Sequence, residues 1–190
     1  DGIMMLMDFA AIIGATLFGV NQTQLIIFVI IIQITGAAGA FLFGKISDKK
    51  SSKDAVVYSL VLLILDMGAL FFIQSLWQFF IVGGIAGFAL SGAQAVSRSM
   101  VGQLAPPNKT AEFFGFLSVA GRTSTFIGPL VFGTLSYRMH NWYSNHGFDA
   151  ITAENNGLYW AIGSIILFLL LGLGILMFVR RVTHKDPLKF

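Results

Sequence analysis

Four polar side chains stand inside stretches of the chain that are otherwise apolar, and these residues could do chemistry. Arg122, Asp8 and Asp66 are ionisable, and Gln94 carries an amide. Because an ionisable side chain in the middle of a membrane helix costs about 2.5–3.5 kcal/mol on insertion scales, each needs a partner or a function. An arginine keeps its charge and could bind an anion, and a buried carboxyl could carry a proton. We therefore predict these residues as candidates for ligand binding or coupling.

Each of these residues also has a structural interpretation. Arg122 stands about eleven residues, or about 15 Å, into its apolar stretch and could form an ion pair with Asp8 or Asp66. Asp66 stands about midway through its own stretch, where Tyr58, Ser59 or a neighbouring helix could supply its hydrogen bonds.

Two further local features are predicted to be structural. Arg98 and Glu112 lie on consecutive apolar stretches, close to the polar segment between them, and we expect them to form an ion pair. Gly128 and Pro129 interrupt the stretch that contains Arg122. Because proline removes a backbone donor and clashes with the preceding turn, we expect the helix to bend there.

Signals for an enzyme or a metal site are weak. His140, His146 and Glu154 share one polar segment, and three such residues in a loop of about twenty make a poor metal site. No His-Glu-x-x-His or Gly-x-Ser-x-Gly motif is present, and there is no cysteine. We predict no enzyme activity, no cofactor and no metal.

The elements that must position these residues are predicted to be membrane-spanning helices. Only 11% of the 190 residues are charged and 56% are hydrophobic, whereas soluble proteins average about 25% charged residues. Polar segments divide the chain into six apolar stretches, each long enough to span a membrane. Most of these polar segments are short, and one is a long predicted loop, residues 136–156. The prediction is an all-α, six-helix transmembrane domain with helices at about 1–19, 25–44, 54–72, 77–101, 111–135 and 157–179.

The basic residues indicate the orientation of these helices. Ten of the 12 Lys and Arg residues fall on the side that would hold both termini, and only Arg138 falls on the other. By the positive-inside rule, both termini are predicted to be cytoplasmic. The net charge of +3 is thus explained by topology, and nucleic acid is not an expected partner.

Small residues recur at four-residue spacing on two of the predicted helices. A stripe of this kind lets two helix backbones approach closely, and ordinary helix packing is its expected role. The residues are Gly36, Ala40 and Gly44 on the second helix and Gly83 and Gly87 on the fourth.

The polar segment between the second and third helices resembles the cytoplasmic loop signature of the major facilitator superfamily. That signature reads Gly-x-x-x-Asp-(Arg/Lys)-x-Gly-(Arg/Lys)-(Arg/Lys). Ser51 and Ser52 stand where the signature has glycine and a basic residue. The matching residues are Gly44, Asp48, Lys49 and Lys53.

Further segments resemble the C-terminal half of the vacuole-effluxer (autophagy-related permease) branch of that superfamily. Besides the opening Asp1-Gly2, they are residues 94–99, 112–115, 121–122 and 128–130. The resemblance implies a secondary transporter that works by alternating access, with this chain as the second of two six-helix halves. It also implies that the first and fourth helices line the central cavity, that the second and fifth face the other half, and that the third and sixth are peripheral.

The resemblance further implies the partners and the location. Members of the branch are linked to efflux of amino acids, so Arg122 could bind a substrate carboxylate. The second half would be either a covalent N-terminal half or another copy of the chain, and Asp1 is predicted to be a cut end of something longer. The expected location is the bacterial cytoplasmic membrane or a vacuolar-type membrane. The alternative is a membrane receptor or assembly module of the same fold that transports nothing.

Overall fold

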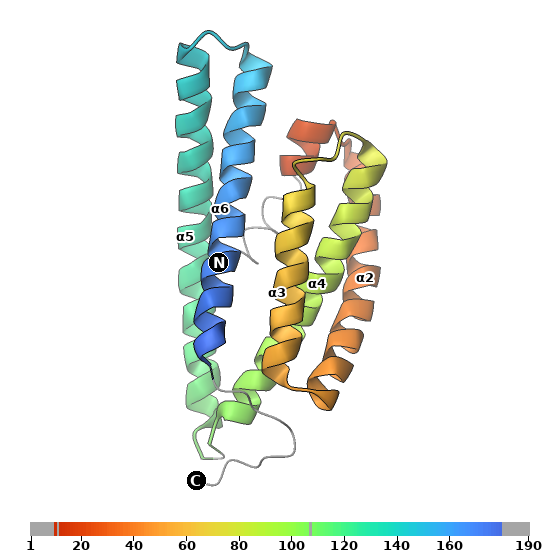
Figure 1. Ribbon diagram of the computed structural model, residues 1–190, viewed down its shortest axis with the longest axis vertical. Coiled ribbons are helices and arrows are strands. Elements are labelled where there is room, and N and C mark those ends of the chain that lie inside the picture. The colour runs from red at the N-terminus through yellow and green to blue at the C-terminus, as the bar shows by residue number, and fades with distance from the viewer. Residues whose placement is uncertain (1–9, 11, 107, 180–190) are drawn as a thin grey trace.

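The structure, a computed structural model, describes residues 10, 12–106 and 108–179, and every regular element in these ranges is a helix (Figure 1). A first helical segment, residues 10 and 12–18, precedes five longer helices. These are α2 (Gln22–Lys49), α3 (Ser52–Ala69), α4 (Leu76–Leu104), α5 (Thr110–Asn145) and α6 (Ala150–Phe178). The all-α prediction is confirmed.

The helices pack in two groups that α3 joins. The helix α4 packs most extensively against α2 and also against α3, whereas α5 packs chiefly against α6. The contacts of α3 with α6 connect the two groups, which stand side by side in Figure 1. We call the end with the α2–α3 turn the loop end, and the end with the α5–α6 turn the hairpin end.

Glycines allow α2 and α4 to pack with their backbones close together. Gly87 belongs to the predicted stripe, whereas Gly39, where the approach is closest, does not. A Cβ atom on Gly39 would overlap the carbonyl oxygen of Phe88, and one on Gly87 would lie 2.9 Å from the carbonyl oxygen of Ile32. Gly44 differs from the prediction, because a Cβ there would meet no atom within 4 Å among the described residues.

The helix ends follow from side-chain caps. Asn21 with Gln24 at the start of α2, and Ser75 with Gln78 at the start of α4, form capping boxes in which each side chain bonds to the other's backbone N–H. The Ser51 side chain accepts a hydrogen bond from the backbone N–H of Lys53 at the start of α3. The segment that resembles the loop signature, residues 44–53, is mainly helical, because α2 continues to Lys49 and α3 begins at Ser52.

The prediction of a long loop at residues 136–156 is wrong. The helix α5 continues to Asn145 and α6 begins at Ala150, so only a short turn separates them. Gly147 adopts a φ of +85° in this turn, which glycine tolerates without steric cost. The polar residues that suggested a loop instead extend both helices beyond the apolar stretch, because a helix needs apolar residues only where lipid surrounds it.

Three of the described helices are long and apolar enough to cross a bilayer: α2, α4 and α6. The helix α3 is shorter than predicted and ends at Ala69, and α5 is longer and contains Pro129 without interruption of the helix. Length and composition thus support three of the six predicted spans.

Candidate functional site

Polar side chains join three helices at the loop end. The hydroxyl groups of Ser47 on α2 and Ser52 on α3 are 2.8 Å apart, and Ser52 donates to Oε1 of Gln103 on α4 at 2.7 Å. Ser47 and Ser52 are both buried. Ser51 and Ser52, which depart from the superfamily signature, thus have structural roles here: one caps α3 and the other connects α2, α3 and α4.

Lys53 extends this connection to α6. Its Nζ atom donates hydrogen bonds to the carbonyl oxygens of Met177 and Val179, both at 2.6 Å. These carbonyls belong to the C-terminal end of α6, where unpaired acceptors and the helix dipole favour a cation. Among the predicted signature residues, Lys53 is the one that holds two distant helices together.

Arg122 lies on α5 with its side chain exposed. It stands twelve residues after the start of α5 at Thr110, about 18 Å along the helix. Val119, Phe126 and Leu130, three, four and eight residues away, are 64%, 72% and 53% exposed. Arg122 therefore belongs to an open, apolar face of α5, which we call the Arg122 face, and it makes no ion pair with Asp66.

The other predicted site residues that the structure describes lie on other helices than Arg122. Gln94 is half-buried on α4, and Asp66 is buried on α3, on separate helices. Asp8 lies outside the described residues. Arg98 and Glu112 are both exposed, and the predicted ion pair between them is not formed in the described part of the chain.

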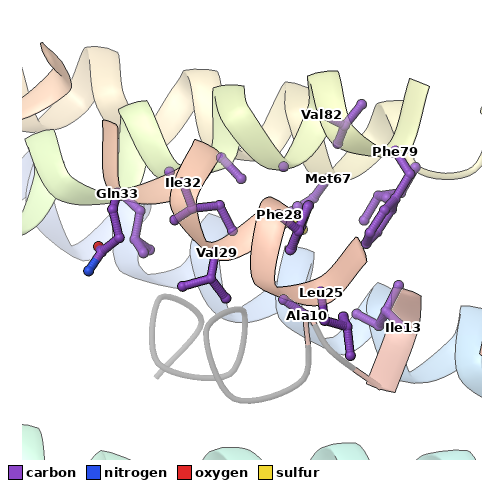
Figure 2. Close-up of a pocket in the computed structure, with 15 residues that line it drawn as sticks. Ala10, Ile13, Leu25, Phe28, Val29, Ile32, Gln33, Met67, Phe79 and Val82 are labelled. Atoms are coloured by element: carbon purple, nitrogen blue, oxygen red, sulfur yellow. The ribbon is translucent and has the colours of Figure 1, made fainter. Parts of the chain in front are cut away.

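The bundle contains an apolar cavity of about 290 Å³ toward the hairpin end of α2 and α4. Figure 2 shows Phe28, Met67, Phe79 and Val82 around it, with the Gln33 amide at one end. Gln33 is the only polar side chain among the described residues that line this cavity. The lining suits an apolar group better than a charged solute.

A second cavity of about 430 Å³ lies between the first helical segment, α5 and α6. Its polar lining residues are Thr16, Ser136, Tyr137, His140 and Glu154. His140 and Glu154 therefore line one cavity. The His146 ring instead forms a hydrogen bond through Nδ1 to the carbonyl oxygen of Trp142, at 2.7 Å. No group of three metal-ligating side chains occurs in the described ranges.

Sequence reasoning missed the Ser47–Ser52–Gln103 contacts and both cavities. The serines stand at the end of one helix and the start of the next, and this position favours capping and buried hydrogen bonds. That Gln103, 51 residues after Ser52, completes the connection depends on how α4 packs, which no local pattern encodes.

Comparison with known proteins identifies relatives that are longer than this chain. It is 25% identical over 187 residues to the "Uncharacterized MFS-type transporter YxiO" of Bacillus subtilis (strain 168), covering 98% of this chain and 40% of that protein. It is 28% identical over 166 residues to "Autophagy-related protein 22" of Coccidioides immitis (strain RS), covering 80% of this chain and 28% of the relative. The chain thus spans less than half of the length of these curated relatives.

A family model gives the same assignment. The model described as "Vacuole effluxer Atg22 like" matches residues 1–153. No solved structure matches the chain. The matched family is one of integral membrane proteins of the major facilitator type, and it is not an enzyme family. The match covers more than half of the sequence, and the chain therefore belongs to the vacuole effluxer Atg22-like family.

Proposed function

We propose that this chain is the second six-helix half of a secondary transporter, which moves a small solute by alternating access. In this proposal the predicted first helix, at about 1–19, and α3 and α5 cross the membrane together with α2, α4 and α6. The relatives are about two and a half times the length of this chain or longer, which leaves room for another half in the same polypeptide. A second copy of the chain is the other possible partner, and both termini are proposed to lie in the cytoplasm.

The observation that carries this proposal is the Arg122 face. A guanidinium in the middle of an apolar helix cannot face lipid without a cost of several kcal/mol. The face instead fits against a second half, where Arg122 would point into a watery cavity between the halves. Apolar residues of α2 are also exposed, among them Ile26, Ile30 and Ile34 at 58%, 51% and 67%. This exposure is expected if α2, like α5, faces the other half of the transporter or the lipid.

The proposed solute carries a carboxylate, and amino acids are the class we favour. Arginine binds carboxylates through two parallel hydrogen bonds, which gives both strength and orientation. Gln94 on α4 and Asp8 on the first helix remain proposed as further groups for binding or coupling. The family description names an effluxer, which fits export of such a solute across a bacterial or vacuolar-type membrane.

The test is transport by the full-length protein in proteoliposomes, with a mixture of radiolabelled amino acids as the probe. Arg122→Gln should lower exchange at least about tenfold, because a hydrogen bond to a charged group is worth about 1.5–3 kcal/mol. Arg122→Lys, which keeps the charge and loses the planar fork, should lower exchange less.

Arg138→Gln is the matched control. Arg138 is an exposed arginine of the same helix near the hairpin end, so its loss should leave exchange within about twofold of wild type. If wild type moves none of the amino acids and other labelled carboxylates are not moved either, the receptor or assembly interpretation replaces this proposal. Equal exchange in wild type and Arg122→Gln would remove Arg122 from the solute path.

A further inference from the structure

Asp66 is a buried acidic residue that the proposed solute path does not use. It lies in the last turn of α3 and is 5% exposed. Its Oδ2 atom has no hydrogen-bond partner. Every other buried side-chain nitrogen or oxygen in the described ranges has one. An unpaired carboxylate in a protein interior is strongly disfavoured, so this group needs a physical explanation.

The neighbours of Asp66 on its own helix are apolar. Leu63, three residues before Asp66 on the same face of α3, is 0% exposed, and Leu70, which directly follows α3, is 3% exposed. Met67, the next residue, is 1% exposed. Ser59, two turns before Asp66, is buried, and its hydroxyl donates to the Val56 carbonyl oxygen at 2.9 Å instead. No donor on this face of the described α3 thus pairs with Oδ2 of Asp66.

The helices that pack against α3 bring no cation to this end of the bundle. On α2 the ionisable residues are Lys45, Asp48 and Lys49, all at the loop end, and on α4 the only one is Arg98. Arg98 stands about 33 Å along α4 from its start near the end of α3. The described part of the first helical segment, which also lines the cavity beside Met67, has no ionisable residue.

The nearer ionisable groups are acidic or neutral. On α6 they are Glu154, which is exposed, and Tyr159, whose ring stacks on Phe71 at 5.6 Å between centroids. On α3 itself Lys53, Asp54 and Tyr58 lie toward the loop end. The Lys53 ammonium group already donates hydrogen bonds to carbonyl oxygens at the end of α6. The C-terminal end of α3 adds its own negative dipole, which disfavours a carboxylate there.

We propose that Asp66 is a proton-binding site: a neutral carboxylic acid in the packed bundle, whose proton is the coupling ion of the transporter. The coupling role rests on the proposed transport function. Met67 and Leu70, adjacent to Asp66 and one turn beyond it, line the apolar cavity shown in Figure 2. When the helices around this cavity separate and water enters, the Asp66 O–H bond can break, with its electron pair left on the carboxylate and the proton passed to water.

Infrared spectroscopy of the full-length protein tests the protonation without any transport. Wild type at neutral pH should show the carbonyl stretching band of a protonated carboxyl, and Asp66→Asn should lose that band. Asp54→Asn is the control, because Asp54 lies in the first turn of α3, where the helix dipole favours a negative charge. The proposal is wrong if wild type and Asp66→Asn show the same carboxyl band.

The Asp66→Asn protein should also fold, because the amide has the shape of the neutral acid. A variant that cannot be purified folded would indicate an ionised Asp66 with a cationic partner, and would overturn the proposal.

Transport then tests the coupling. With labelled amino acids, Asp66→Asn should exchange solute at equal pH on both sides within about twofold of wild type. Its accumulation under a pH gradient should fall to the level seen without a gradient. Gradient-driven accumulation that survives the substitution would refute the coupling role. If wild type neither exchanges nor accumulates, the transport proposal fails, while the infrared result still decides whether Asp66 holds a proton.

Discussion

Lys53 is the residue whose substitution should most affect the loop end. Its ammonium group donates to two carbonyls at the end of α6, and these contacts join residues more than 120 positions apart. Lys53→Met should lower the free energy of unfolding by about 1–3 kcal/mol, because hydrogen bonds to charged groups contribute about 1.5–3 kcal/mol and the site is partly exposed. Thermal unfolding of the purified full-length protein in detergent measures this.

Lys49→Met is the matched control for that measurement. Lys49 belongs to the same loop signature, and its side chain is exposed at the end of α2. Its substitution should change stability by no more than about 0.5 kcal/mol. Equal losses for both variants would show that the signature acts through its total charge and not through the contacts of Lys53.

At the residue scale, the sequence predicts which side chains are unusual better than it predicts their surroundings. Arg122 stands in the middle of a helix, as expected, but its exposure depends on how little α5 packs on α4. Asp66 was expected midway along its helix and lies in the last turn instead, because α3 ends at Ala69 in a stretch that remains apolar. Hydropathy alone does not reveal such an end.

At the element scale, the packing of α2 on α4 depends on one glycine in particular. A side chain on Gly39 would overlap the Phe88 backbone, which cannot move without displacing α4. Gly39→Ala should therefore lower the free energy of unfolding by about 1–3 kcal/mol, the usual range for overpacking. Gly44→Ala, on the same helix with open space around it, should be neutral or slightly stabilising because alanine favours helix. Both are measured by thermal unfolding, and a loss for Gly44→Ala equal to that for Gly39→Ala would contradict the assigned contact.

The start of α6 should respond to pH through its cap. Hydrogen bonds from the side chain and the backbone of Thr152 lower the pKa of Asp149, which accepts from the Thr152 N–H at 3.2 Å. Because the pKa is lowered in the folded state, the cap stabilises the helix fully when the pH is above the ordinary carboxyl pKa of about 4. This stabilisation is lost as the pH falls through the lowered pKa.

Hydrogen exchange of the first-turn amides of α6 measures this effect. After correction for intrinsic exchange rates, protection should fall as the pH drops below about 4 in wild type. In Asp149→Asn protection should stay constant, because the amide caps the helix without titrating. A fall of equal size in both proteins would assign the pH dependence to another group.

The α5–α6 hairpin also shows where element prediction from sequence ends. The number and order of helices follow from apolar stretches, and so do the caps once the helix starts are known. The polar residues from Ser136 to Asn156 carry helix as well, and hydropathy assigned them to a loop. Gly157 lets the two helices approach closely in that segment, because a Cβ atom there would lie only 2.7 Å from the Ser136 carbonyl oxygen.

At the scale of the whole molecule, the proposed topology places the α5–α6 turn and the α2–α3 turn on opposite sides of the membrane. The chain has no cysteine of its own, so single cysteines introduced into it can report on each side. A cysteine at Gly147, in the hairpin turn, should react with a membrane-impermeant maleimide added outside intact cells. A cysteine at Lys49, at the loop end, should react only after the membrane is permeabilised. Any native cysteines in the remainder of the full-length protein would first be replaced.

This labelling test decides between arrangements that composition leaves open. With all six helices crossing, the two turns must lie on opposite sides, because the third, fourth and fifth spans separate them. If only α2, α4 and α6 crossed, one span would still separate the turns, so a third cysteine is needed, at Gln74 in the α3–α4 turn. Six spans require Gln74 to react from outside like Gly147. With three spans, α4 alone would separate the α3–α4 turn from the hairpin, and Gln74 would be protected together with Lys49.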